Sequence, residues 1–252
     1  MSGFSSQWLA LREPADLAAR APGLLTRLRA WGGSRDLRVM DLGAGTGSTL
    51  RSLEATLPLA RWVLADADLG LLLEAKTRHP AVETAQIDLS GTPLPAVACD
   101  LVTASALLDL VSEEWLDRFC DALSARNLPL YAALNYDGVM EWHPVHHLDV
   151  AITTAFNRHQ QTDKGLGPAL GPLATEAVRK RLEAVGYSVD IQPSPWRLRD
   201  TPLHAELLEG IATAVGETGQ VPGHAIADWL AFRRLNAGEA SIGHWDLLAL
   251  PS

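Results

Sequence analysis

The chain has 252 residues, of which 47% are hydrophobic, and this is enough for one large α/β domain with its own core. Its formal net charge of −9 argues against a nucleic-acid-binding protein, because such proteins cluster Lys and Arg on one surface. No apolar run reaches the length of a membrane span, and no basic segment followed by an apolar one starts the chain. We therefore expect a cytoplasmic protein that binds neither nucleic acid nor membrane.

A glycine-rich turn is the most informative stretch of the sequence. The turn, Gly43 to Gly47, follows the apolar run 37–42 and precedes a segment in which Leu50, Leu53 and Leu57 share one helical face. Glycines let the backbone approach a ligand closely, and the N-terminus of a helix offers free N–H groups. The order of strand, turn and helix therefore predicts a nucleotide-type binding site at this turn.

The spacing of the glycines separates two kinds of site. A dinucleotide-binding fingerprint, G-x-G-x-x-G, would have its third glycine where this chain has Ser48, so a nicotinamide-dependent oxidoreductase is a less favoured alternative. With Asp41 two residues before the first glycine, the pattern D-L-G-A-G-T-G closely resembles motif I of the class I S-adenosylmethionine-dependent methyltransferases. In that family the turn holds the amino-acid end of the cofactor.

Two further acids end predicted strands, and the resemblance extends to both. Asp66 lies about twenty residues after the turn, where an α/β nucleotide site places a carboxylate for the ribose hydroxyls, as in motif II of the family. At Asp88 the family has an acid that accepts a hydrogen bond from the adenine amino group, and the next apolar residue, here Leu89, packs on the ring. Two alternatives stay open: Asp68 and Asp66 exchange roles, or Asp88 only forms the turn before Ser90.

The tip of the fourth predicted strand, Ser105, is expected to lie beside the methyl donor. The tip lacks the N-P-P-Y tetrapeptide of amino-methylating enzymes, so methylation of nucleic acids or protein amides is not indicated. Together these positions predict a site for S-adenosylmethionine formed by Asp41, Gly43, Ala44, Gly45, Gly47, Asp66, Ala67, Asp88, Leu89 and Ser105.

Predicted strands and helices alternate along the chain, which is typical of an α/β fold with a parallel sheet. The strands are expected at 37–42, 61–66, 82–87, 100–105, 128–134, 187–191 and 241–250. We expect a doubly wound, seven-stranded, mostly parallel sheet with helices on both faces, and the resemblance implies that the last strand is antiparallel. Two helices between residues 201 and 236 are predicted to form a late insertion before that strand.

A single domain, 1–252, is expected, with a helical cap (1–34), a cofactor-binding half (35–135) and a substrate-side half (136–252). The cap is predicted to be helical from Phe4 to Trp31, with interruptions near Pro14 and Pro22. In the family such leading helices close over the cofactor. The cap residues that are candidates to face the site are Trp8, Arg12 and Arg20.

Candidates for catalysis lie beyond the fifth predicted strand. Tyr136, His146 or His147 is predicted to serve as a general base, with His143 and His159 as weaker candidates. No metal is predicted: a zinc site at the histidines is a minor alternative, because no Cys accompanies them and the ligand set is incomplete.

Two cations and a loop complete the substrate side. Arg158 and Lys164 are candidates to bind an anionic group of the substrate. The loop 163–172, rich in Gly and Pro, is either a substrate clamp or lid or a plain surface connection.

The function favoured by these patterns is methyl transfer from S-adenosylmethionine to a small-molecule acceptor. An alternative is a non-catalytic regulatory or assembly protein that binds the cofactor or S-adenosylhomocysteine, because cofactor motifs indicate binding and not turnover. The acceptor and the oligomeric state cannot be inferred from the sequence.

Overall fold

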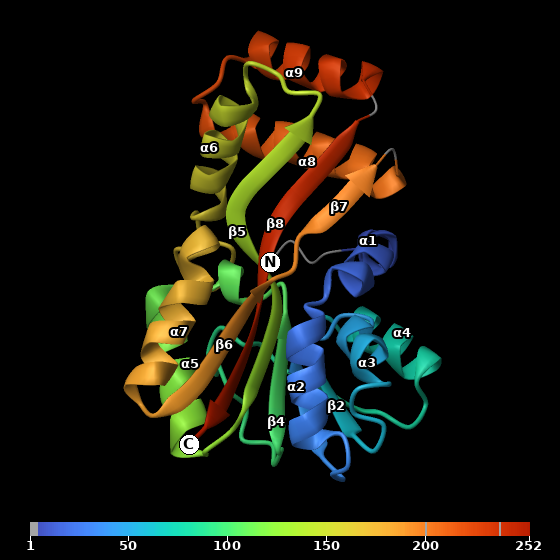
Figure 1. The fold of residues 1–252 in the computed structure, drawn as a ribbon, viewed down its shortest axis with the longest axis vertical. Coiled ribbons are helices and arrows are strands. Elements are labelled where there is room, and N and C mark those ends of the chain that lie inside the picture. Colours follow the sequence, from blue (N-terminus) through green and yellow to red (C-terminus); the bar gives the residue numbers. More distant parts are fainter. Residues whose placement is uncertain (1–4, 200, 237) are drawn as a thin grey trace.

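A computed structural model describes residues 5–199, 201–236 and 238–252, so the predicted helix start at Phe4 lies outside the described residues. One eight-stranded sheet forms the centre of the molecule (Figure 1). The strands are β1 (Arg38–Leu42), β2 (Arg61–Asp66), β3 (Glu83–Gln86), β4 (Leu101–Ser105), β5 (Leu130–His143), β6 (Tyr187–Pro193), β7 (Trp196–Arg199) and β8 (Glu239–Pro251). Their order is β3-β2-β1-β4-β5-β8-β6, and β7 pairs with β8 beside β6.

The direction of the strands confirms the predicted fold class. Strands β1 to β5 pair in parallel, and β8 is antiparallel to both β5 and β6. All seven predicted strands are present, and β7 is an eighth that the sequence did not predict. β7 is only four residues long and has two arginines in it, so no apolar run marks it, and it forms by pairing with the first part of β8.

The predicted end of the fifth strand at Leu134 is also wrong. β5 continues to His143 and pairs with β8 along nearly its whole length, from Leu130↔Ala249 to His143↔Glu239. The register shifts twice, once before Asn135 and once after Tyr136. These irregularities coincide with the polar residues that suggested the strand's end, so the sequence pattern stops where the strand only bends.

Helices cover both faces of the sheet. They are α1 (Ser6–Ala19), α2 (Pro22–Gly32), α3 (Ser48–Leu53), α4 (Leu69–Arg78), α5 (Glu113–Ala125), α6 (Asp149–Gln160), α7 (Ala174–Ala184), α8 (Pro202–Thr218) and α9 (Gly223–Leu235), with 3₁₀ turns η1 (Leu108–Leu110) and η2 (Gly171–Leu173). In Figure 1, α2, α3 and α4 lie on one side of the strands, and α5 and α7 lie on the other. Helices α6, α8 and α9 gather around the far end of β5 and β8, where α8 and α9 form the predicted insertion.

The predicted interruption at Pro22 is confirmed, because α2 begins there, but the one near Pro14 is wrong. Pro14 lies inside α1, where it removes one backbone hydrogen bond. A buried ion pair between Arg12 and Asp16, one helical turn apart, spans the proline on the same helix. This pair and the packing of α1 against β7 let the helix continue.

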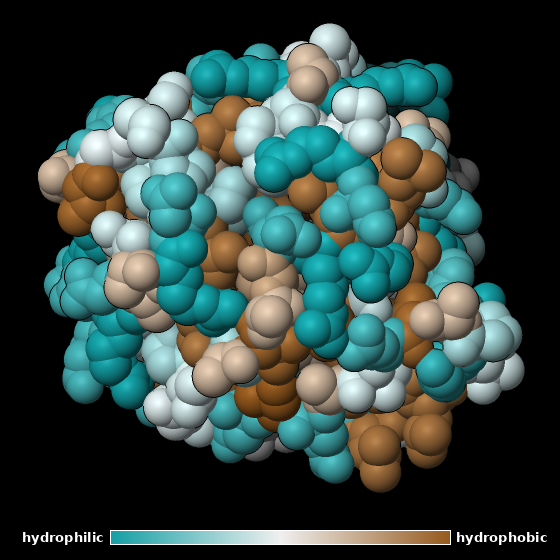
Figure 2. All heavy atoms as spheres, turned by 90° about the horizontal axis from the view of Figure 1, so that it is seen from below, coloured by the Kyte–Doolittle hydropathy of each residue, from teal (hydrophilic) through white to brown (hydrophobic). Residues whose placement is uncertain are grey.

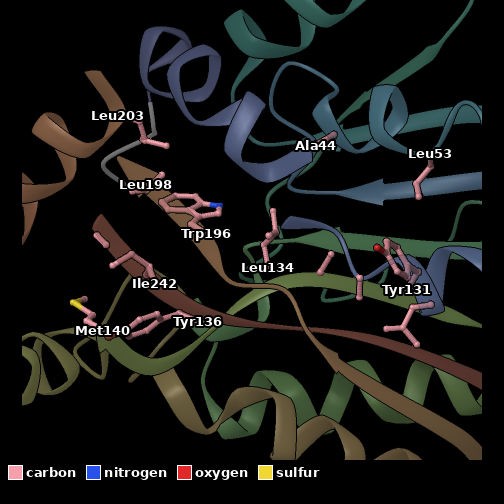
Figure 3. Packing of buried hydrophobic residues seen from close by; sticks show 14 of the residues in the cluster. Ala44, Leu53, Tyr131, Leu134, Tyr136, Met140, Trp196, Leu198, Leu203 and Ile242 are labelled. Carbon is pink, nitrogen blue, oxygen red and sulfur yellow. The ribbon is translucent and has the colours of Figure 1, made fainter. Parts of the chain in front are cut away.

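One cluster of buried hydrophobic side chains runs from the parallel strands of the sheet to the extension, which is the part of β5 and β8 beyond the pocket together with β7. Figure 3 shows it running from Leu53 and Tyr131 to Trp196 and Met140. Figure 2 shows the lower end of the molecule, away from this extension, where hydrophobic residues form separate groups among hydrophilic ones. No helix in the described part of the chain is long and apolar enough to cross a membrane.

The buried carboxylate of Asp246 on β8 fixes the middle of the sheet. It accepts hydrogen bonds from the backbone N–H of Ala21 (3.0 Å), the backbone N–H of Leu134 (2.9 Å) and the hydroxyl of Tyr131 (3.1 Å). The start of α2 and the bend of β5 are thereby tied to the same strand. A buried acid of this kind is stabilising only as long as these donors surround it.

A second buried acid, Asp41, lies on β1 and accepts a hydrogen bond from the Thr103 hydroxyl of β4 at 2.7 Å. Burial raises the pKa of Asp41 from 3.8 to about 7. The folded protein therefore binds this proton more tightly than the unfolded chain does. Its stabilising effect is complete below about pH 4 and is lost as the pH rises through about 7.

We predict that Asp41→Asn removes this pH dependence, because the Asn amide is neutral at every pH and still accepts the Thr103 hydrogen bond. Between about pH 4 and 7 the free energy of unfolding of the wild type should fall by roughly 4 kcal/mol relative to the variant, and above pH 7 the difference should stay constant. Urea denaturation of the cofactor-free proteins at a series of pH values measures it. A difference that does not vary with pH would contradict the burial of a titrating Asp41.

Candidate functional site

A pocket of about 600 Å³ opens at the carboxyl ends of β1 to β4. It is lined by every residue predicted to bind the cofactor except Asp41 and Gly47. Asp41 is completely buried beneath the glycine turn, and Gly47 begins α3 with a φ of +84°. Asp41 and Gly47 therefore support the glycine turn but do not line the pocket.

The glycine turn curves because three of its residues have positive φ. Gly43, Gly45 and Gly47 have φ values of +63°, +52° and +84°, a region that glycine adopts without steric cost. The backbone N–H of Gly45 donates a hydrogen bond to Asp66 at 2.8 Å. A Cβ at position 45 would lie 2.9 Å from the end of the Leu9 side chain on α1, which would have to shift, and the φ of +52° disfavours any residue but glycine.

The carboxylate of Asp66 at the end of β2 contacts two backbone N–H groups, those of Gly45 (2.8 Å) and Asp68 (2.9 Å). Each carboxylate oxygen has a further lone pair, so both remain able to accept from hydroxyl groups in the pocket. Asp68 instead caps α4, accepting from Gly70 (2.7 Å) and Leu71 (3.2 Å). This favours Asp66 over Asp68 as the ribose-binding acid.

Asp88 and Leu89 follow β3 and form one wall of the pocket. Asp88 accepts a hydrogen bond from the Ser90 N–H at 2.9 Å, which lowers the pKa of its carboxyl. Asp88 therefore does form the turn before Ser90. It also lines the pocket, so its carboxylate can contact a ligand there as well. Leu89 is buried, and its carbonyl accepts a hydrogen bond from the Trp115 indole at 2.7 Å.

At the tip of β4, Ser105 and the two residues after it face the pocket. The Ser105 hydroxyl accepts a hydrogen bond from the buried guanidinium of Arg20 at 2.9 Å. Ala106 has a φ of +50°, which is unusual for a residue other than glycine and turns the chain sharply toward η1. Strain of this kind is concentrated at functional sites.

The cap contributes a wall of its own. Leu9, Arg12 and Asp16 line the pocket, and their spacing of three and four residues places them on one face of α1. Arg12 makes two hydrogen bonds to Asp16 (2.9 and 3.2 Å), and Asp16 also accepts from the Trp196 indole at 2.9 Å. Among the cap candidates only Arg12 lines the pocket. Leu9 and Asp16 were missed, although the helical spacing was a signal that could have identified them.

The residues predicted to be a general base do not line the pocket. Tyr136 is buried on β5, where burial raises the pKa of its phenol and its hydroxyl donates to Asn157 at 2.7 Å. Because β5 runs on to His143, it carries His146 and His147 away to α9. Their rings lie 4.4 Å apart, and His146 packs on Phe232. The predicted placement of these three side chains beside the methyl donor is therefore corrected.

Of the remaining substrate-side candidates, only some line the pocket. Lys164 and Leu166 line the pocket, whereas His143, His159 and Arg158 do not. Lys164 was a candidate, but Leu166 carries no signal in the sequence because its loop has no periodicity. Within the ranges that the structure describes, no group of three or more His, Cys, Asp or Glu side chains is placed to hold a metal ion.

Comparison with known proteins agrees with this arrangement. Residues 39–126 match a protein family described as a methyltransferase domain. A trans-aconitate 2-methyltransferase of Paracidovorax citrulli is 36% identical over 89 residues, or 34% of each chain. Another from Methylobacterium nodulans is 35% identical over 112 residues, which are 44% of this chain and 37% of that protein. The match thus spans little more than a third of the length of these relatives.

Solved structures extend the likeness over nearly the whole chain, at the level of the fold. A cyclopropane-fatty-acyl-phospholipid synthase-like protein from Lactobacillus casei has a TM-score of 0.58 at 12% identity and covers 98% of this chain and 94% of its own. A protein from Bacillus halodurans described as a candidate methyltransferase has a TM-score of 0.54 at 14% identity and covers 90% and 99%. Residues 39–126 thus resemble methyltransferase domains in sequence, and the chain as a whole resembles these two structures in fold alone.

Proposed function

We propose that this protein transfers the methyl group of S-adenosylmethionine to a small-molecule acceptor. The observation that carries the proposal is the meeting of the glycine turn, Asp66, Asp88 and Ser105 in one pocket at the carboxyl edge of the sheet. Ligands of open α/β sheets bind at this edge. The family match over residues 39–126 supports the same cofactor.

The residues fit the cofactor from one end to the other. The backbone at Gly43 and Gly45, which has no side chains, gives the amino-acid end close access to the turn. The Asp66 carboxylate is placed to accept from both ribose hydroxyls, and Asp88 with Leu89 is placed to bind the adenine ring. The sulfonium end then lies toward Ser105, where the acceptor must approach.

The methyl-transfer reaction needs few chemical groups from the protein. Bound S-adenosylmethionine supplies a methyl group that is already activated by its positive sulfur. The pocket walls then act by aligning the acceptor with the methyl group and by excluding water. Leu9 on the cap and Leu166 on the loop enclose the pocket from two sides, which suits both tasks. A small-molecule acceptor and a cytoplasmic location remain parts of the proposal.

Turnover is the direct test of this function. We expect the purified protein, given S-adenosylmethionine and a small-molecule extract of a bacterial culture, to produce S-adenosylhomocysteine in an amount that depends on the extract. Mass spectrometry of both cofactor forms measures it. Tight binding of the cofactor without turnover in any extract would favour the non-catalytic binding protein instead.

We predict that Gly45→Val abolishes binding of S-adenosylhomocysteine in titration calorimetry. The new side chain would collide with Leu9 and occupy the space in front of the turn, at a φ that a β-branched residue disfavours. Gly210→Val is the matched control, because nothing lies within 4 Å of a Cβ at that position. Retained binding in the Gly45 variant would show that the ligand lies elsewhere.

We also predict that Asp66→Ala weakens binding of S-adenosylhomocysteine by about 1–3 kcal/mol, the scale for losing a charged hydrogen-bond acceptor. The loss combines the ribose contacts with the support that Asp66 gives to Gly45. Asp36→Ala is the control: it also removes a carboxylate, but the ion pair that it makes with Arg61 is exposed and worth little. Equal affinities of the two variants in calorimetry would contradict the assignment of Asp66.

A further inference from the structure

Lys164 contributes a positively charged side chain to the wall of the pocket, and the charge of Glu217 acts on it from outside that wall. Among the residues that the structure describes, no carboxylate oxygen lies within 4.0 Å of its amino group. Partial burial lowers the pKa of Lys164, because the ammonium group is held out of water. Arg12, the second cation in the described wall, is already paired with Asp16. Lys164 is therefore the cation that is available to a ligand.

Two side chains from other elements orient the Lys164 amino group. Nδ1 of His159, at the end of α6, lies 3.2 Å from Lys164 Nζ, and Nε2 of the same ring lies 2.8 Å from the Glu217 carboxylate of α8. An ammonium group can only donate, so Lys164 Nζ donates to Nδ1 of the His159 ring. His159 thus engages one of the three N–H bonds of the Lys164 ammonium group.

The loop that carries Lys164 is fixed to the wall and is not a free surface connection. The Leu166 carbonyl accepts a hydrogen bond from the Ser112 N–H at 3.2 Å, and the Leu170 N–H donates to the Val111 carbonyl at 2.8 Å. Gly167, with a φ of +84°, lies so close to Ser112 that a Cβ there would approach its side chain to 2.9 Å. Such anchoring makes the position of Lys164 a property of the fold.

The composition of the wall points in the same direction. None of its described residues is His, Tyr or Cys, and its acids are engaged by Arg12 or by backbone N–H groups of the turn and cap residues. A wall whose described residues include no His, Tyr or Cys suits an acceptor that reaches it already ionised, since no proton then has to be removed before methyl transfer. Carboxylates are ionised at neutral pH.

We propose that the methyl acceptor is an organic anion whose charged group is bound by Lys164, and that His159 and Glu217 are positioning residues for that lysine. The inference rests on the proposed methyl transfer. It names the substrate class of the same pocket: a small acid with two carboxylates, one bound at the Lys164 wall and the other, already ionised, presenting the reacting oxygen toward Ser105. The trans-aconitate in the names of the two relatives is itself a carboxylate, in agreement with this class.

The first test separates acceptors by charge. A small-molecule extract of a bacterial culture is divided on an anion-exchange resin at neutral pH, and each fraction is incubated with the protein and S-adenosylmethionine. Formation of S-adenosylhomocysteine in the retained, anionic fraction alone supports the inference. Formation in the unretained fraction overturns it while leaving methyl transfer intact. Formation in neither fraction contradicts the proposed function, and the inference fails with it.

Variants then test the role of Lys164 on the active fraction. Lys164→Met should raise KM for the acceptor by about 10-fold or more, with kcat and the affinity for S-adenosylhomocysteine nearly unchanged. Lys164→Arg should restore part of the loss because it keeps the charge, and His159→Leu should raise KM less than Lys164→Met does. Lys180→Met, at an exposed lysine paired with Glu176, is the matched control.

Two outcomes would overturn the assignment of Lys164. An unchanged KM in Lys164→Met would mean that the acceptor anion is bound elsewhere. A large fall in kcat in both Lys164→Met and Lys164→Arg, with KM unchanged, would mean that the lysine works as a base and not as an anion-binding group.

Discussion

The hydrogen bond from the Gly45 N–H to the Asp66 carboxylate connects the two strands on which the pocket depends. It joins the turn after β1 to the tip of β2, and it starts from a residue with a positive φ, which glycine adopts without strain. Leu9 of the cap lies directly over the same glycine. The glycine turn, the Asp66 carboxylate and the cap helix α1 therefore meet at Gly45.

The long β5–β8 ladder explains how the substrate side is assembled. The chain leaves the pocket along β5, reaches the far end of the molecule and returns through α6 (Figure 1). Near the end of α6 is His159, which meets Glu217 of the inserted α8 and then Lys164 of the returning loop. The helical insertion thus contributes to the pocket indirectly, by fixing the side chain that orients a cation in its wall.

The cofactor half could be predicted from sequence, and the substrate half could not. Gly43, Asp66 and Asp88 are marked by local rules, because each follows a strand whose apolar run is visible and parallel strands bring their ends together. Tyr136 and His146 depended on where β5 ends, which is decided by pairing with β8 near the other end of the chain, as in His143↔Glu239. The Lys164 contact with His159 likewise arises from tertiary packing and has no periodic signature.

The most direct test of the central claim is a crystal structure of the protein with S-adenosylhomocysteine. The account predicts the ligand across the carboxyl edge of the sheet, with both ribose hydroxyls within hydrogen-bonding distance of the Asp66 carboxylate and the sulfur nearest to Ser105. A ligand bound outside this pocket, or with its ribose turned away from Asp66, would contradict it.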